Sequence, residues 1–594
     1  MKQSLQIILP KAQENISSLE RSDHSYSLQA TLGSFYTSQY LIARQWIESL
    51  TGKLSFQLFD ENIFKAKLFA EQLPDGSWYA VFDGAFPLRG DITATFFNYW
   101  YLKSSGEDIN SPALIKARGY ILSHGGLEKM TLFSKVFMAM FDNYSWSKIP
   151  YIPYLLFSKV SPVREKSFGQ WVGPHLMPIS YLRNNQIHKN LGSLFDLDEL
   201  NVSQNKVENK IKKLSLIDRK IIKLMREHQD SKGLWGGYTL ATILCSMSLA
   251  YDYSRSHHAE NLLAIENGLQ KVEALSFDSP GSNYDGVVDD GHIWDTALMT
   301  RALLESHYLQ KDLKPQGELL VNRQQANGGL PFGYGFEKYP DVDDTAEVIL
   351  ALQKMGGYEP SILKAKNFIF KMQNKDGGWG AFSKNNTEIS ILSNYLSPFN
   401  DSVDFYDESS PDVTGHVLEA LAVIGINKNN SELVKKAIQY LKKTQDSSLA
   451  AWEGRWGVNY LYGTAAVIVG LVKQGENPEE IYIKKATDWL LSKQNADGGF
   501  GESFQSYKDK SWAGKGMSTA SQTAWVLQAL SLAGYKNHPV TLKAVSYLIS
   551  NFESGSKFTD PSDVGTGHPG IVYMRYPSYA YAFPLIALSE WLND

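Results

Sequence analysis

The feature that most constrains this fold is a short motif that recurs along the chain. A glutamine is followed, usually six residues later, by an aromatic residue, with glycine between them in the clear copies. The clear copies are Gln72-LPDGS-Trp78, Gln229-DSKGL-Trp235, Gln373-NKDGG-Trp379 and Gln494-NADGG-Phe500. Weaker copies are Gln324-QANGG-Leu330 and, one residue longer, Gln445-DSSLAA-Trp452. Self-similarity of this kind is typical of repeat architectures.

The clear copies follow amphipathic helix patterns. Segments 364–373 and 484–494 place apolar residues at helical spacing, and the glycines after them end the helix. More apolar helices are predicted over 345–355 and 521–534. Each repeat is therefore predicted to be a helix pair. A closed ring of such pairs is an α/α toroid with amphipathic helices outside and apolar helices inside.

Motif copies in both halves of the chain predict an all-α fold of two α/α toroids. An open solenoid is the alternative, but long insertions such as 383–411 argue against it. We expect 290–594 to form the toroid that carries the catalytic residues. Residues 26–289 are expected to form an inserted second α/α barrel, and 1–25 to pack on the catalytic toroid. The motif glutamine and tryptophan are expected to tie each outer helix to the next repeat.

Composition excludes several classes of protein. Of the 594 residues, 43% are hydrophobic and 20% charged, which excludes a disordered chain. The net charge of −5 gives no basic field for nucleic acid. The single cysteine, Cys245, excludes an internal disulfide and a multi-cysteine zinc site. The aromatic content of 12% is unusually high and needs a reason.

No segment reads as a membrane span. Residues 233–251 are uncharged, but they begin with a glycine-rich turn and carry several hydroxyl side chains, which predicts a buried helix. Residues 131–157 are rich in aromatic and aliphatic side chains, a pattern more typical of core than of a membrane-contacting surface. The N-terminal apolar stretch is too short for a signal peptide, so we expect a cytoplasmic location.

Three carboxylates cluster at one predicted helix start, Asp341, Asp343 and Asp344. A single aspartate there would be an ordinary N-cap. Three repel one another, which keeps at least one protonated and able to donate a proton. Asp412 and His416 are four residues apart and share a helix face. A histidine hydrogen-bonded to the cluster would strengthen the acid, although His416 alone is more typical of a core residue.

The segment DVDDTA at 341–346, together with the repeats, DVTGHVLEAL at 412–421 and GRWGVNYLYGT at 454–464, resembles the squalene–hopene cyclase family of class II triterpene cyclases. The resemblance runs from about residue 70 to the end. It implies a linear polyprene folded in a cavity and protonated at a terminal alkene by Asp343. It also implies no metal and no organic cofactor, because the acid is a side chain.

The same resemblance implies roles for further residues. Asp341 and Asp344 would flank the acid, His416 with Asp412 would activate it, and Tyr462 would belong to its hydrogen-bond network. The family's cavity aromatics match Trp171, Trp294, Phe332, Phe382, Trp456, Tyr573, Tyr576 and Tyr579. Aromatic faces stabilise a desolvated cation by about 2 kcal/mol or more without quenching it, which explains the composition.

Two positions depart from the family. Squalene-cyclising members carry Phe where this chain has His568 and Val572. The departure leaves open early termination, a different substrate or a rearranged aromatic supply, with His568 either structural or a terminating base. The segment 384–401 resembles the tetraprenyl-β-curcumene cyclases, whereas His416 is the squalene-type residue. Substrate therefore stays open between squalene, giving a hopene-type or less cyclised product, and a C35 polyprene.

Other classes are weighed against this one. A metal-dependent ionising terpene synthase would need DDxxD rather than DxDD, and a toroidal prenyltransferase would need a zinc-ligating cysteine near the matching repeats. A toroidal glycosidase would need an open polar cleft. A non-catalytic isoprenoid-binding scaffold is the remaining alternative. The lipid substrate implies monotopic docking on the cytoplasmic face of the cell membrane, and the resemblance also implies a homodimer.

Overall fold

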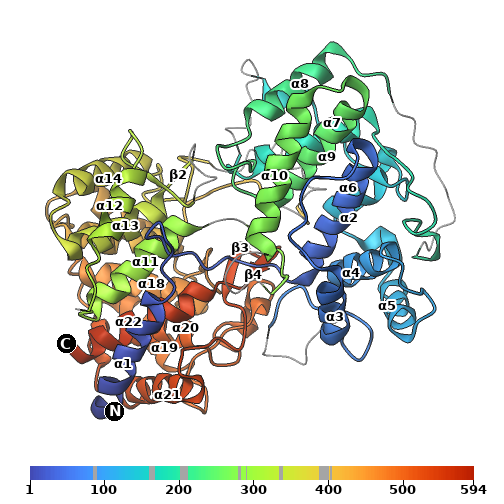
Figure 1. Ribbon diagram of the computed structural model, residues 1–594. Helices are drawn as coiled ribbons and strands as arrows, with labels where there is room; N and C mark the ends of the chain where they lie inside the picture. Colours follow the sequence, from blue (N-terminus) through green and yellow to red (C-terminus); the bar gives the residue numbers. More distant parts are fainter. Residues whose placement is uncertain are drawn as a thin grey trace.

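The computed structural model describes residues 1–83, 90–158, 168–200, 212–277, 283–288, 291–308, 310–333, 339–386, 400–401 and 404–593. Two helical halves lie side by side, and both chain termini lie on the C-terminal half (Figure 1). The two small sheets of the described residues are hairpin-like pairs. They are β1 (Leu330–Pro331) with β2 (Pro340–Asp341), and β3 (Gly565–His568) with β4 (Val572–Met574).

The C-terminal half is a closed ring of helix pairs. Among the described residues the inner helices are α11 (His292–Glu305), α13 (Val342–Met355), α16 (Pro411–Val423), α18 (Tyr460–Lys473), α20 (Ala520–Leu530) and α22 (Pro577–Asn593). Each packs on the next, and α22 packs on α11, which closes the ring. The outer helices are α12 (Lys314–Arg323), α14 (Glu359–Met372), α17 (Glu432–Thr444), α19 (Ile481–Leu491) and α21 (Pro539–Gly555). The predicted toroid, with amphipathic helices outside, is confirmed.

The N-terminal half repeats this arrangement less regularly. Its inner helices include α2 (Ser34–Thr51), α4 (Ile92–Ser104), α6 (Leu132–Met140), α7 (Val172–Asn185) and α9 (Thr239–Ser256). Outside them lie α3 (Glu61–Glu71), α5 (Pro112–Ser123), α8 (Leu216–Glu227) and α10 (Ala259–Phe277). Helix α9 is buried from Thr239 to Asp252, as predicted for the uncharged window. Within the described residues no helix has the length and hydropathy that a membrane crossing requires.

The start of the chain connects the two halves. Helix α1 (Lys2–Ser17) packs on α22, α21 and α11 of the C-terminal half. The backbone N–H of Leu28 then donates to Asp295 Oδ2 at 2.7 Å, and Thr31 pairs with both Val287 and Arg575. The predicted boundary at 289–290 lies outside the described residues, as does most of the 383–411 insertion, so the boundary stays a prediction.

The repeat motif ties each outer helix to its neighbours. Gln373 Nε2 donates to the carbonyls of Gly377 and Leu433, both at 2.8 Å, and Trp379 Nε1 donates to Ile369 at 2.8 Å. The glutamine thus spans its own turn and the start of the next outer helix. The same pair of bonds is made by Gln72, Gln229, Gln324, Gln445 and Gln494. The predicted structural role of the motif is confirmed.

Buried charge links the inner helices beyond their first turns. Arg301 of α11 contacts Glu347 of α13 at 3.0 Å and Glu419 of α16 at 2.5 Å. The network continues through Lys473 of α18 to Glu419 and Glu590, and through Gln528 of α20 to Glu590. Every inner helix contributes one side chain. Because a buried charge is costly without its partner, the network favours one register of the ring.

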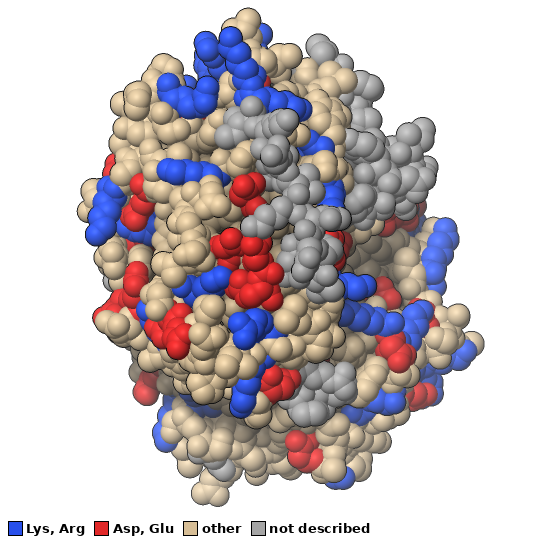
Figure 2. Space-filling model, turned by 90° about the vertical axis from the view of Figure 1, so that its right-hand side faces the viewer, with Lys and Arg blue, Asp and Glu red and all other residues tan. Residues whose placement is uncertain are grey.

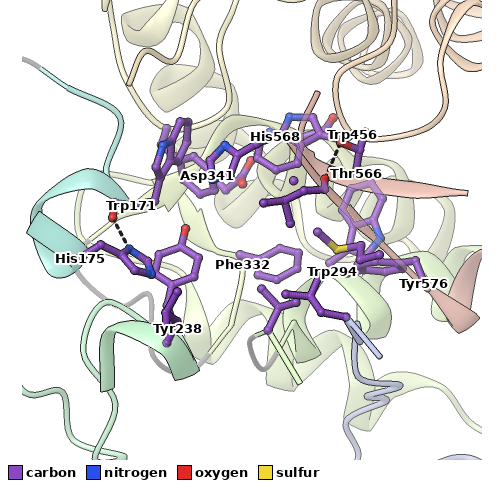
Figure 3. Close-up of a pocket in the computed structure, with 18 of the residues that line it drawn as sticks. Trp171, His175, Tyr238, Trp294, Phe332, Asp341, Trp456, Thr566, His568 and Tyr576 are labelled. Atoms are coloured by element: carbon purple, nitrogen blue, oxygen red, sulfur yellow. Dashed lines mark hydrogen bonds between the residues drawn. The ribbon is translucent and has the colours of Figure 1, made fainter. Parts of the chain in front are cut away.

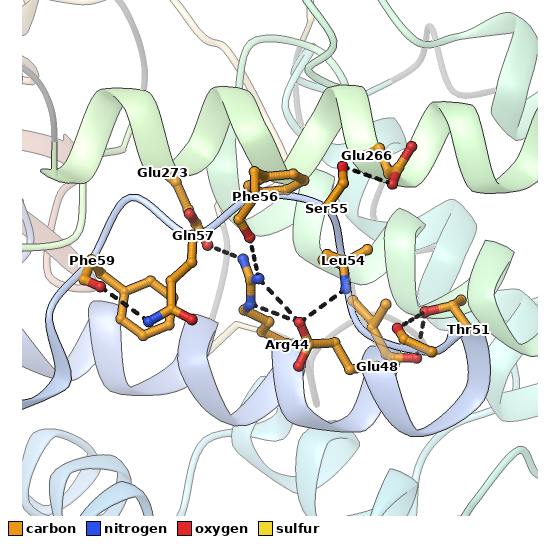
Figure 4. Close-up of polar contacts among 12 residues, drawn as sticks. Arg44, Glu48, Thr51, Leu54, Ser55, Phe56, Gln57, Phe59, Glu266 and Glu273 are labelled. Atoms are coloured by element: carbon orange, nitrogen blue, oxygen red, sulfur yellow. Dashed lines mark hydrogen bonds and ion pairs between the residues drawn. The ribbon is translucent and has the colours of Figure 1, made fainter.

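A smaller network holds the N-terminal half. Arg44 of α2 forms ion pairs with Glu48 and with Glu273 of α10, and donates to the Phe56 carbonyl at 2.5 Å (Figure 4). Leu58 N–H donates to the other oxygen of Glu273 at 2.8 Å. The loop after α2 is therefore fixed between two helices by one buried guanidinium and one buried carboxylate.

Replacing Gln373 by Met tests the motif. The substitution keeps the side-chain length but leaves the Gly377 and Leu433 carbonyls without their donor, which costs about 1–3 kcal/mol for a buried group. We expect urea unfolding to show a free energy of unfolding lower by that amount. The control is Gln6→Met on the exposed face of α1. Equal stability of the two variants would contradict a structural role for the motif.

Candidate functional site

A cavity lies between the two halves and is lined by residues of both (Figure 3). Of the residues proposed from the sequence, the lining includes Trp171, Trp294, Phe332, Phe382, Trp456, His568, Val572, Tyr576 and Tyr579, together with Asp341, Asp343 and Asp344. Residues more than 400 positions apart thus meet around one mostly aromatic space.

The cavity-facing helices present their first turns. These turns supply Tyr36 of α2, Phe133 of α6, Leu240 of α9, Trp294 of α11, Asp343 of α13 and Tyr579 of α22. Helix N-termini carry partial positive charge, which stabilises a carboxylate placed among them. The architecture therefore favours an ionised acid at the cavity wall once a proton has left it.

Asp341 is the N-cap of α13. Its Oδ1 accepts hydrogen bonds from the backbone N–H groups of Asp343 at 2.7 Å and Asp344 at 3.2 Å. The ordinary capping role of an aspartate at a helix start is thus taken by Asp341. This leaves the side chain of Asp343, which is 6% exposed, for another role at the cavity wall.

Asp343 is joined to His416 of α16. The distance from His416 Nδ1 to Asp343 Oδ1 is 2.7 Å. Burial lowers the pKa of His416, but the Asp343 carboxylate, with Asp412 and Glu419, outweighs burial and raises the pKa to about 9. The imidazole is therefore protonated at neutral pH and Nδ1–H donates to Asp343. Asp343 itself lines the cavity, so Oδ2, the oxygen that does not contact His416, is the one that can carry a transferable proton.

The pKa values of the two flanking acids are raised. Burial, and then the charge of Asp343, raise the pKa of Asp341 well above its ordinary value. Burial, and then the charges of Asp341 and Asp343, do the same to Asp344. The sequence predicts that at least one of the three carboxyls keeps its proton, and these directions agree with that prediction.

Asp412 and Tyr462 lie beside His416 but do not extend its hydrogen bonds. Asp412 Oδ2 accepts from the backbone N–H groups of Arg455 at 2.8 Å and Trp456 at 3.0 Å, so the side chain fixes the turn that carries Trp456. The Tyr462 ring meets His416 edge-on at 5.8 Å, and its buried hydroxyl has no hydrogen-bond partner among the described residues. The predicted hydrogen-bonding role of Tyr462 is therefore not seen.

The aromatic side chains lie in two groups around the space. Near the acid, the ring centroid of Tyr579 lies 6.5 Å from that of Trp294 and 4.5 Å from that of Tyr576. In the other group, the ring centroid of Phe382 lies 6.1 Å from that of Trp171 and 6.0 Å from that of Trp456. Packed ring edges and faces give a wall that attracts cations and offers few lone pairs.

Tyr573 lies outside the cavity lining, which corrects the sequence-based assignment. It is the central residue of β4, and successive side chains of a strand point to opposite faces. Val572 and Met574 consequently line the cavity, while Tyr573 stacks on Phe504 at 4.1 Å. Treating the segment as a strand, in which neighbouring side chains alternate between faces, would have placed Val572 and Tyr573 on opposite sides.

His568 of β3 faces the cavity as a neutral side chain. Its ring lies edge-on to Trp171 at 5.1 Å. Burial, and then the nearby Arg455 guanidinium, lower the pKa of His568 to about 3. Its Nδ1 is buried and has no hydrogen-bond partner among the described residues.

Sequence reasoning missed much of the wall supplied by the N-terminal half. The missed residues are Leu32, Tyr36, Phe133, His175, Tyr238, Leu240 and Val288, together with Thr566, Gly567 and Met574 of the hairpin. Most are apolar and carry no chemical signature. His175 could have been found, because it lies four residues after Trp171 and so on the same helical face. Among the described residues, no group of three or more His, Cys, Asp or Glu side chains is arranged to hold a metal ion.

Comparison with known proteins shows the family to which the chain belongs. Sequence models of the squalene-hopene cyclase N-terminal and C-terminal domains match residues 9–216 and 291–593. The chain is 34% identical to squalene-tetrahymanol cyclase of Tetrahymena thermophila, over 98% of this chain and 91% of the relative. It is 31% identical to squalene–hopene cyclase of Alicyclobacillus acidocaldarius, over 88% of each.

A further relative and one solved structure extend the comparison. Squalene–hopene cyclase of Bradyrhizobium diazoefficiens is 28% identical, over 99% of this chain and 95% of its own. The fold also matches ent-copalyl diphosphate synthase of Streptomyces platensis, with a TM-score of 0.52 at 15% identity, covering 97% of this chain and 99% of that one. Both family models and the relatives span nearly the whole length. The chain belongs to the squalene–hopene cyclase family and is a class II triterpene cyclase.

Proposed function

We propose that the protein cyclises squalene, and that Asp343 starts the reaction by protonating a terminal alkene. The observation that carries this proposal is the hydrogen bond between His416 and Asp343 at the wall of an aromatic cavity. The names of the three relatives support the substrate, since each is a squalene cyclase. The non-catalytic scaffold offers no reason for a buried imidazolium beside the acid.

The first step moves one proton from Asp343 Oδ2 to an alkene carbon. The alkene π electrons form the new C–H bond and leave a tertiary cation, which the next double bond attacks. The charge left on Asp343 is stabilised by the His416 imidazolium and by the first turn of α13. These contacts are stronger to the carboxylate than to the carboxylic acid, so they favour proton transfer.

The later cations move along the aromatic walls. Trp171, Phe382 and Trp456 offer ring faces and edges, and a desolvated face stabilises a cation by about 2 kcal/mol or more. Val572 and His568 supply less of this stabilisation than phenylalanine would. Weaker stabilisation of the later cations can stop the cyclisation before all rings have formed, so the proposal includes a less cyclised triterpene.

Incubation of the detergent-solubilised protein with squalene tests the proposal. We expect gas chromatography–mass spectrometry to show a cyclic C30 product, and Asp343→Asn to reduce it by at least about a hundredfold, because general acid catalysis is lost. Folded protein that leaves squalene unchanged would contradict the substrate, and a C35 polyprene would be tried next. Product from Asp343→Asn at the unaltered rate would contradict the role of the acid.

The rate should depend on the protonation of His416. Because its pKa is raised to about 9, the imidazolium is present below that pH, and we expect kcat to fall as the pH rises through about 9. The contribution of the ion pair to stability has the same sign: it is complete below the ordinary pKa of about 6.5 and declines as the pH rises through about 9. Initial rates between pH 6 and 10 measure this. The His416→Gln variant should have a lower kcat, and its kcat should not decline near pH 9. A pH profile of the variant equal to that of the unaltered enzyme would contradict the role of His416.

We propose further that the protein docks on the cytoplasmic face of a membrane. An apolar patch formed by Tyr151, Leu155, Leu216 and Ile217 has exposures of 50, 57, 75 and 57%. The hydrogen bond from Tyr154 to Asp218 brings its two segments together. Helix α8, which begins at Leu216, carries four basic side chains, a charge that suits the anionic cytoplasmic leaflet. Figure 2 shows further basic side chains across the upper part of the molecule. The homodimer stays a prediction.

Vesicle binding tests the apolar patch. Replacing Leu216 and Ile217 with Ser removes buried apolar area in the bound state, so we expect binding to vesicles with anionic lipid to weaken about tenfold or more. Co-sedimentation measures the bound fraction. The control is Leu363→Ser on α14 of the other half, a residue that is 53% exposed. Equal loss in both variants would argue for non-specific binding.

A further inference from the structure

A second histidine, His175, faces the cavity from the N-terminal half. It lies in the first turn of α7, one turn after Trp171, and is 9% exposed. Its ring stacks on Phe133 at a centroid distance of 6.0 Å and meets Tyr238 at 5.4 Å. Figure 3 shows the ring between Trp171 and Tyr238 at the edge of the drawn space. Two ring contacts and the helix fix its orientation.

The tautomer of His175 follows from its hydrogen bond. Nδ1 lies 2.7 Å from the Trp171 carbonyl oxygen, which accepts and cannot donate. Nδ1 therefore carries the hydrogen, and Nε2 carries the lone pair. Burial lowers the pKa of His175 to about 4, so the ring is neutral at physiological pH. A neutral imidazole with one lone pair is a proton acceptor that does not compete with the starting acid.

The other polar groups of the wall are less suited to accept a final proton. The three aspartates lie at the end where the reaction begins, on α13 of the opposite half. His568 lies near the Arg455 guanidinium, which opposes a second positive charge. No guanidinium or ammonium group contributes to the pKa of His175. The position of His175, on the far half from Asp343, suits the end of a reaction that moves away from the acid.

A neighbouring cavity shares part of the wall beside His175. It shares Tyr36, Phe133 and Leu240 with the main cavity and continues toward the polar side chains of Asp401 and Lys508. Since Phe133 stacks on His175, the histidine lies beside this junction. A proton received by His175 thus lies next to a second cavity that has polar side chains in its wall.

We propose that His175 is the base that ends the cyclisation, an inference that rests on the proposed function. The C–H bond next to the last cationic carbon breaks, and its electron pair forms the product alkene. The proton passes to Nε2, while Nδ1–H stays on the Trp171 carbonyl. One proton enters from Asp343 and one leaves through His175, so the product has the formula of the substrate, as an isomerisation requires.

His175→Gln tests this role directly. The glutamine amide can still donate to the Trp171 carbonyl but is not a base. With squalene as the probe, we expect squalene consumption to continue while the main alkene isomer falls about tenfold or more relative to other isomers, alcohols and partly cyclised products, as removal of a general base predicts. Gas chromatography–mass spectrometry gives the ratio. His175→Asn is a second variant with a shorter amide.

The control is His188→Gln. His188 also bonds through Nδ1 to a backbone carbonyl, that of Gln186 at 2.9 Å, but it lies outside the cavity lining. We expect its product ratio to match that of the unaltered enzyme. An unaltered ratio in His175→Gln would overturn the inference, as would an alcohol as the main product of the unaltered enzyme. Squalene left unchanged by the unaltered enzyme would instead contradict the proposed function.

Discussion

The hydrogen bond between His416 and Asp343 joins two neighbouring helices of a closed ring, and its length depends on their register. The register is held one turn further along the same helices. Glu347 follows Asp343 on α13, Glu419 follows His416 on α16, and both contact Arg301 of α11. A buried guanidinium tolerates little displacement of its carboxylates. The buried ion pairs one turn away thus hold the acid in place.

The arrangement separates two environments within one bundle. Ion pairs occupy one end of the inner helices, while aromatic and apolar side chains surround the cavity at their first turns. A carbocation reaction needs both, because the acid requires a nearby cation to stabilise the charge it acquires, and the intermediates require a surface without nucleophiles. The inner helices α11, α13 and α22 supply this separation, because each one is long enough to carry a cavity residue in its first turn and a charged residue further along.

The N-terminal half completes the cavity. Trp171, His175 and Phe133 come from its helices and meet the acid-bearing half across the space. The Arg44 and Glu273 network keeps α2 and α10 in register, and α2 presents Tyr36 to the cavity. Stability of the second half therefore bears on the shape in which a flexible polyprene is held. This is a structural reason for an N-terminal toroid in an enzyme whose acid lies in the C-terminal toroid.

Sequence alone determined the features that local chemistry dictates. The helical spacing of apolar residues before the motif of Gln373 and Trp379 predicted helix pairs, because the glycines that follow end the helix. The spacing of Asp341, Asp343 and Asp344 predicted an acid cluster, because three adjacent carboxyls cannot all ionise in a dry site. Resemblance to a family supplied the candidate role of Asp343 and most of the aromatic wall.

Tertiary structure decided what depends on direction and on distant contacts. Strand alternation turned Tyr573 away and Val572 inward, and Asp412 bonds the turn that carries Trp456 while its charge also raises the pKa of His416. Tyr238 joined the site only because two halves of the chain face each other, which no local pattern encodes. Periodicity fixes which face of a helix is buried, but only packing decides which buried face borders a cavity.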